Sequence, residues 1–86
     1  MNLAQNELLL CEQTQDFIKT LYRQSKISGY VQINFIASQL GLSSGSAMKT
    51  TQFLQRLGFV FYEKYGRITL TDDGKRYAKT LLRYEK

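Results

Sequence analysis

The 86-residue sequence contains no histidine, no proline and only one cysteine. Without histidine, and with neither a paired nucleophile and base nor a phosphate-cradling glycine loop, the usual catalytic sites cannot be assembled, so we expect no enzymatic activity. Cys11 has no partner for an internal disulfide, which makes a cytoplasmic, nucleoid-associated location the default expectation. An unpaired cysteine behaves as a small apolar residue, so we expect Cys11 to be buried; pairing between subunits is the alternative.

Long apolar runs are also missing. No segment approaches the roughly 20 apolar residues that cross a bilayer. The N-terminal stretch MNLAQNELLLCEQ has no basic residue ahead of its leucines, so we expect neither a signal peptide nor a membrane anchor. The chain does have 43% apolar residues and eleven aromatic side chains (six Tyr and five Phe), which suffices for one compact core. We therefore expect a single domain over residues 1–86.

Acidic residues are scarce in the second half of the chain. Residues 1–43 carry three basic and three acidic side chains, whereas residues 44–86 carry nine basic and four acidic ones, so the net charge of +5 arises entirely from the second half. This placement is expected where phosphates are bound. Charge alone is equally typical of a solvated basic surface.

The segment at 42–58, LSSGSAMKTTQFLQRLG, predicts a short amphipathic helix from about Gly45 to Leu57. Ser43 or Ser44 is expected to cap its N-terminus, and Gly58 its C-terminus. At 100° per residue one arc of the helix is small or apolar, and the opposite arc has no acid. The first arc comprises Ala47, Thr50, Thr51, Leu54 and Leu57, and the second comprises Gly45, Lys49, Gln52 and Arg56.

Immediately upstream, Asn34–Leu40 predicts a shorter helix that ends at Gly41, with a few residues of turn before the next helix. This pattern is typical of a helix-turn-helix, whose second helix enters the major groove of DNA. The apolar residues of the shorter helix, Phe35, Ile36, Ala37 and Leu40, are expected in the core.

Two β-rich runs, 59–64 and 67–71, follow the second helix and are joined at Tyr65-Gly66, which predicts a hairpin wing. We expect Phe59–Tyr62 to be covered on both faces, Ile68 and Leu70 to face the core, and Gly66 to adopt a positive φ. Residues 30–33 predict a third strand or an extended lead-in. Thr71 is placed to cap a last helix from Asp72 to about Tyr84. The expected fold is α+β, mainly α: a winged helix-turn-helix with a two- or three-stranded wing sheet.

Residues 3–25 lack Gly and Pro and predict one long helix or two collinear ones, with the polar stretch Gln24–Gly29 ending it. Its apolar stripe is Leu10, Thr14, Phe17, Ile18 and Leu21. Leu8 and Leu9 lie off this stripe, which makes residues 3–11 a candidate dimerisation arm, since a reader of palindromic DNA needs a twofold partner. The alternative is a helix end packed on its own domain. The candidate dimer residues are Leu3, Leu8 and Leu9 in the arm and Leu81 and Leu82 on the apolar side of the last helix.

Several side chains of the second helix and the wing are suited to DNA. Lys49 projects from the first exposed turn and can donate to guanine O6 or N7, whereas Arg56 is better placed for a phosphate. Lys64, Tyr65 and Arg67 surround Gly66 and make a basic tip able to follow the minor groove or its flanking phosphates. The candidate DNA-binding residues are Ser43, Ser44, Lys49, Gln52, Arg56, Lys64, Tyr65 and Arg67.

Four motifs occur in order: DFIKTLY, GY followed by INFIASQLGLSSGSAMKTTQFLQRLGFV, YEKYGRITLT, and the TxxGxxxA spacing from Thr71 to Ala78. Over Asp16 to about Leu82 the chain resembles the N-terminal DNA-binding domain of the iron- and manganese-dependent repressors, the diphtheria-toxin-repressor type. The resemblance implies that Gly45 and Ser46, together with Ser43 and Lys49, approach DNA. Gly45 stands where the family usually has proline.

The metal ligands of that family are not matched. The resemblance implies an acid-x-x-acid pair on the first helix, a histidine after the wing, and further ligands in a following dimerisation domain, before which this sequence stops. Here Asp16 keeps the first acid, Lys19 replaces the second, and Glu85 stands at the histidine position. Because an ammonium group repels a divalent cation, we expect no metal and no other cofactor.

The leading hypothesis is a homodimeric, metal-independent transcription regulator that binds double-stranded DNA with sequence preference. The alternative is a winged-helix module that docks on another protein, because one fold hosts many functions.

Overall fold

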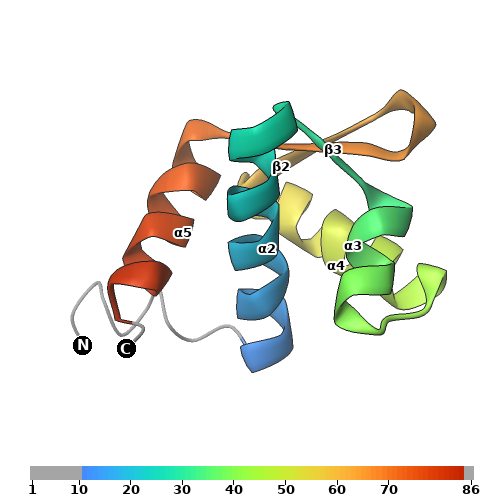
Figure 1. Ribbon diagram of the computed structural model, residues 1–86, viewed down its shortest axis with the longest axis horizontal. Coiled ribbons are helices and arrows are strands. Elements are labelled where there is room, and N and C mark those ends of the chain that lie inside the picture. Colours follow the sequence, from blue (N-terminus) through green and yellow to red (C-terminus); the bar gives the residue numbers. More distant parts are fainter. Residues whose placement is uncertain (1–10, 85–86) are drawn as a thin grey trace.

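The computed structural model describes residues 11–84, so the predictions for Leu3, Leu8, Leu9, Leu10 and Glu85 lie outside the described residues. Figure 1 shows the arrangement: α2 lies between α5 on one side and α3 with α4 on the other, and the strands extend into a hairpin. The elements in order are α2 (Glu12–Ser28), β1 (Val31–Gln32), α3 (Ile33–Leu40), α4 (Ser44–Arg56), β2 (Val60–Glu63), the 3₁₀ turn η1 (Lys64–Gly66), β3 (Arg67–Leu70) and α5 (Asp72–Arg83).

Helix α2 is the central element of the core. Its predicted stripe is buried at every described position, with Phe17 and Ile18 fully inaccessible to solvent. The helix continues to Ser28, beyond the predicted range of 3–25, and ends within the polar stretch Gln24–Gly29 as predicted. Polar residues do not stop a helix whose outer face is in water; the stop comes at Gly29, which adopts φ 83° and donates its N–H to the Ser25 carbonyl at 2.8 Å.

Cys11 is exposed, so the prediction that it is buried is wrong. It immediately precedes α2, and its Sγ lies 3.1 Å from Thr14 Oγ1 in the first turn. That hydrogen bond is the main cause that lowers the pKa of the Cys11 thiol below its usual range.

The helix-turn-helix is formed by α3 and α4, which pack on each other as predicted. Gly41 ends α3 in a left-handed conformation with φ 67°. Ile36 and Ala37 are buried, but Phe35 is 37% exposed, so its predicted place in the core is wrong. The reason is geometric: in an eight-residue helix the core side is the stripe of Ile33, Ile36, Ala37 and Leu40, and Phe35 lies off it.

The sheet has the order β1-β3-β2 with both pairings antiparallel, so the predicted third strand is present. Ile68 and Leu70 face the core as predicted. The prediction that Phe59–Tyr62 is covered on both faces is wrong, because Phe61 is 60% and Tyr62 37% exposed. Phe59 instead precedes the strand and stacks on Tyr77 of α5, with ring centroids 4.8 Å apart.

Helix α5 begins as predicted, with the Thr71 side chain accepting the Gly74 N–H at 3.0 Å and two aspartates in the first turn. Its buried face, Tyr77, Ala78 and Leu81, packs on α2. No helix in residues 11–84 combines the length and the apolar character that a bilayer crossing requires.

Candidate nucleic-acid interface

The rotation of α4 about its axis decides which side chains it presents. Ala47, Thr51 and Leu54 are fully buried. The buried Thr51 hydroxyl donates a hydrogen bond to the Ala47 carbonyl at 2.8 Å, so this polar group has a partner in the core. The opposite arc is exposed as predicted and comprises Gly45, Lys49, Gln52 and Arg56.

Leu57, predicted on the buried arc of α4, is 44% exposed. The helix ends at Arg56, and the chain then turns at Gly58, which has φ 84°. At 100° per residue Leu57 lies roughly 80° from Ala47, at the edge of the predicted arc, where its side chain is only partly covered.

The N-terminus of α4 is capped by Ser43 and not by Ser44. The Ser43 Oγ accepts the Ser46 N–H at 3.1 Å and also contacts the Ser46 Oγ at 3.1 Å. Ser44, Gly45 and Ser46 are exposed in the first turn. The remaining first-turn N–H groups and the positive end of the helix dipole therefore face solvent, which suits an anionic group such as a phosphate.

The tip of the wing is the 3₁₀ turn η1. Gly66 adopts φ 74°, as predicted, but Tyr65 also has a positive φ of 66°, which is uncommon for a residue with a side chain. The tyrosine is 86% exposed. The turn thus holds an aromatic ring and the Lys64 ammonium at the far end of the hairpin.

Arg67 lies one step back from the tip. Its guanidinium carbon is 4.7 Å from the centroid of the Tyr30 ring, a cation–π contact, and the residue pairs with Gln32 across β1 and with Glu63 across β2. Sequence reasoning missed Tyr30 in this role, because the contact depends on the register of β1 against β3.

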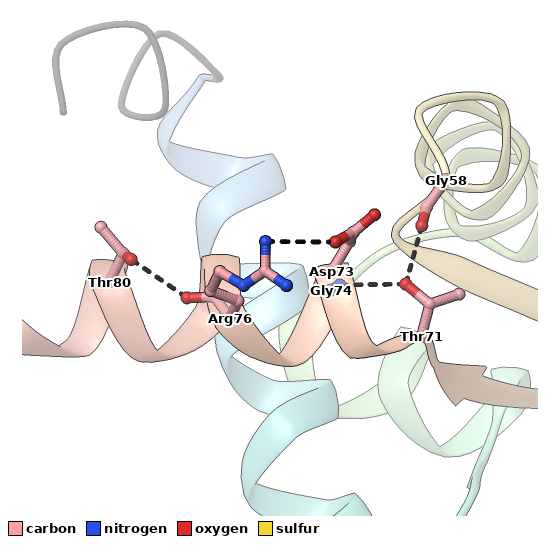
Figure 2. A network of polar contacts seen from close by, with 6 residues as sticks. All are labelled: Gly58, Thr71, Asp73, Gly74, Arg76 and Thr80. Atoms are coloured by element: carbon pink, nitrogen blue, oxygen red, sulfur yellow. Dashed lines mark hydrogen bonds and ion pairs between the residues drawn. The ribbon is translucent and has the colours of Figure 1, made fainter. Parts of the chain in front are cut away.

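Figure 2 shows the polar joint between the end of α4 and the start of α5. The Thr71 hydroxyl donates to the Gly58 carbonyl at 2.7 Å, and the Thr71 N–H donates to the Phe59 carbonyl at 3.0 Å. Gly74 lies directly against the Phe59 carbonyl. Because α5 packs on α2, this joint fixes the C-terminal end of α4 relative to the rest of the core.

The residues at the position of the family's metal pair do not fit a divalent cation. The Lys19 ammonium lies 3.6 Å from a carboxylate oxygen of Asp16, so a positive charge already lies beside this carboxylate and would repel a divalent cation there. Within residues 11–84 no three His, Cys, Asp or Glu side chains lie close enough to hold a metal ion.

The two predicted dimer residues on α5 differ in exposure. Leu81 is 4% exposed and belongs to the core, whereas Leu82 is partly buried. Lys75 and Lys79 lie near Leu82 around the helix and are exposed, so a symmetric contact through this side of α5 would bring like charges together. The role of Leu82 in a dimer stays a prediction.

Solved structures share the fold of this chain. The chain superimposes on NadR, solved in complex with 4-hydroxyphenylacetate, with a TM-score of 0.77 and 18% identity over 93% of this chain and 58% of that one. It superimposes on MepR, a transcription regulator of the Staphylococcus aureus multidrug efflux pump MepA, with a TM-score of 0.76 and 16% identity over 92% of this chain and 60% of that one. At this identity the similarity establishes the winged-helix fold and no more.

Relatives found by sequence are more similar to this chain than these solved structures are. The chain is 32% identical to the HTH-type transcriptional regulator MntR of Bacillus subtilis (strain 168) over 68 residues, which are 79% of this chain and 48% of the relative. It is 34% identical to MntR of Lysinibacillus sphaericus over 79% of this chain and 49% of the relative. The chain therefore spans about half the length of the curated relatives it matches. Residues 9–68 match the iron dependent repressor, N-terminal DNA binding domain, and the chain belongs to that family.

Proposed function

We propose that this chain is a homodimeric, metal-independent transcription regulator that binds double-stranded DNA with sequence preference. The observation that carries the proposal is the exposed arc of α4 with Lys49, Gln52 and Arg56. The helix contains no acidic residue, and Ala47, Thr51 and Leu54 on its opposite face are fully buried. In this proposal α4 enters the major groove, with Lys49 on base edges and Arg56 on the backbone.

The remaining candidate residues complete the proposed contact. The first turn of α4, with Ser43, Ser44, Gly45 and Ser46, receives a phosphate on its free N–H groups and hydroxyls. The wing adds Lys64, Tyr65 and Arg67 against the neighbouring groove or its phosphates. These wing contacts contribute affinity with little sequence preference.

DNA binding should fall steeply with salt and be indifferent to metal. Several phosphate contacts release counterions, so the logarithm of the affinity should fall linearly with the logarithm of the salt concentration. Because Lys19 is paired with Asp16, adding manganese or iron should leave the affinity unchanged. Fluorescence anisotropy on duplex DNA, in chelator and then in each metal, measures both. Binding that appears only with metal would contradict metal independence.

The dimer should form in the presence of chelator. If the arm at residues 3–11 joins two copies, sedimentation equilibrium at tens of micromolar should give twice the monomer mass. Changing Leu8 and Leu9 to Ser should shift the protein to monomer, because each buried leucine contributes ~1.5–3 kcal/mol. Arg56→Ala, which leaves the arm intact, is the matched control. A wild-type chain that sediments as a monomer would refute the homodimer.

The alternative function, a module that docks on a protein, is favoured by one observation. Three apolar side chains on α4, the following turn and β2 are exposed: Phe53 by 39%, Leu57 by 44% and Phe61 by 60%. Contiguous exposed apolar groups mark protein interfaces, so the docking function requires these three side chains to form one patch. The salt series separates the two functions, because absence of DNA binding at low salt would favour the docking module.

A further inference from the structure

Gln55 links the recognition helix to the wing. It lies in the last turn of α4, and its side-chain Oε1 accepts the backbone N–H of Tyr62 in β2 at 2.9 Å. Strand β2 is an edge of the sheet, since β3 pairs with it on one side only. The Tyr62 N–H therefore points away from the sheet and is satisfied by a helix side chain.

The two edges of the sheet are held in different ways. On the β1 edge, Val31 and Gln32 pair with β3, and Tyr30 lies under the Arg67 guanidinium. On the β2 edge, the base of the strand is joined to Thr71 through the Phe59 carbonyl, but Phe61, Tyr62 and Glu63 are exposed. A short hairpin is marginally stable by itself, so the direction of its outer half depends on such anchors. The hydrogen bond from the Tyr62 N–H to Gln55 anchors the part of β2 that lies beyond Phe59 and closer to the tip of the wing.

We propose that Gln55 is a positioning residue that makes α4 and the wing move as one unit, so that the basic tip meets DNA in a fixed relation to Lys49. This inference rests on the proposed DNA-binding function. The same contact also occupies an edge N–H that another chain's strand would otherwise pair with, a recurrent protection of sheet edges.

The test compares Gln55→Met, which keeps the length of the side chain and removes the acceptor, with Gln39→Met. Gln39 is an exposed glutamine on α3 and is the matched control. Each variant is also combined with Lys64→Ala and Arg67→Ala, which remove the charge of the wing. Hydrogen exchange of the Tyr62 amide and DNA affinity are measured for every protein, and circular dichroism verifies the fold.

In Gln55→Met the Tyr62 amide should exchange roughly two- to tenfold faster, as the loss of one hydrogen bond implies, while Gln39→Met leaves it unchanged. Gln55→Glu keeps an acceptor and should restore the protection. Removing the wing charges should weaken DNA binding in the wild type. In Gln55→Met the same removal should cost roughly two- to tenfold less, because a wing that is no longer held has already lost part of its contact.

Either of two results would overturn this inference and leave the proposed function standing. The first is an unchanged exchange rate of the Tyr62 amide in Gln55→Met. The second is a loss of DNA affinity on removing the wing charges that is the same in the wild type and in Gln55→Met. If Gln55 only stabilised the fold, Gln55→Met would lower stability but would not change the loss of affinity on removing the wing charges, which is the second result. If the wild-type chain fails to bind duplex DNA even at low salt, the proposed function falls, and the inference falls with it.

Discussion

Replacing Gly74 with alanine is expected to lower the free energy of unfolding by about 3 kcal/mol or more, the upper end of what overpacking costs. A Cβ at this position would collide with the carbonyl oxygen of Phe59 and would lie 2.9 Å from its carbonyl carbon. Both are backbone atoms, which cannot rotate away as the end of a side chain can.

The surroundings of Gly74 explain why the backbone cannot yield. The Phe59 carbonyl accepts the Thr71 N–H, and the Phe59 ring stacks on Tyr77. The preceding Gly58 carbonyl accepts the Thr71 hydroxyl (Figure 2). Moving Phe59 away from a new methyl group would strain or break these contacts. The same shift would displace the C-terminal end of α4, so DNA affinity should fall together with stability.

Thermal and urea unfolding measure the effect. A domain of this size loses roughly 4–8 °C in Tm per kcal/mol, so Gly74→Ala should melt at least ~12 °C below the wild type. Gly45→Ala is the matched control, because a Cβ there meets only Ser43 Oγ at 4.0 Å. Alanine at this helical position should raise stability by up to about 1 kcal/mol. A Gly74→Ala protein that melts within 2–3 °C of the wild type, a margin well below ~4–8 °C per kcal/mol, would show that the joint is not tight.

Lys49→Ala is expected to remove about 1–3 kcal/mol of discrimination at one base pair in each half-site, which corresponds to roughly 5- to 150-fold in affinity for the preferred base. Lys49 is exposed in the first half of α4, and the buried face of that helix holds its direction. The loss should be confined to one position because a single side chain reads a single base pair.

Arg56→Ala is the control for this prediction. Arg56 lies on the same exposed arc two turns further on, where we expect a phosphate contact. Its removal should weaken all sequences alike and reduce the slope of affinity against salt by about 1. A binding-site library selected with each variant distinguishes the two effects. If both variants lose affinity uniformly across the library, Lys49 does not read a base.

Most of the fold was predictable because its signals are local. The turn after α3, a serine cap at position 43 or 44 of α4, the Thr71 cap of α5 and the positive φ of Gly66 each depend on residues within a few positions of one another. The exposed arc of α4 also follows from helical spacing alone, since a helix with one apolar face has only one way to bury it. These are the features that place Lys49 and Arg56 on the surface.

The sequence by itself thus determined the order of the elements, the Thr71 cap of α5 and the exposed side of α4. Only the tertiary structure decided that β2 is an exposed edge, that Arg67 lies on Tyr30, and that Gln55 joins α4 to Tyr62. Strand alternation tells which residues share a face but not whether anything covers that face, so the exposure of Phe61 was predicted wrongly. The contacts of Arg67 and Gln55 depend on strand register and on the packing of α4 against β2, and these are set by the whole core at once.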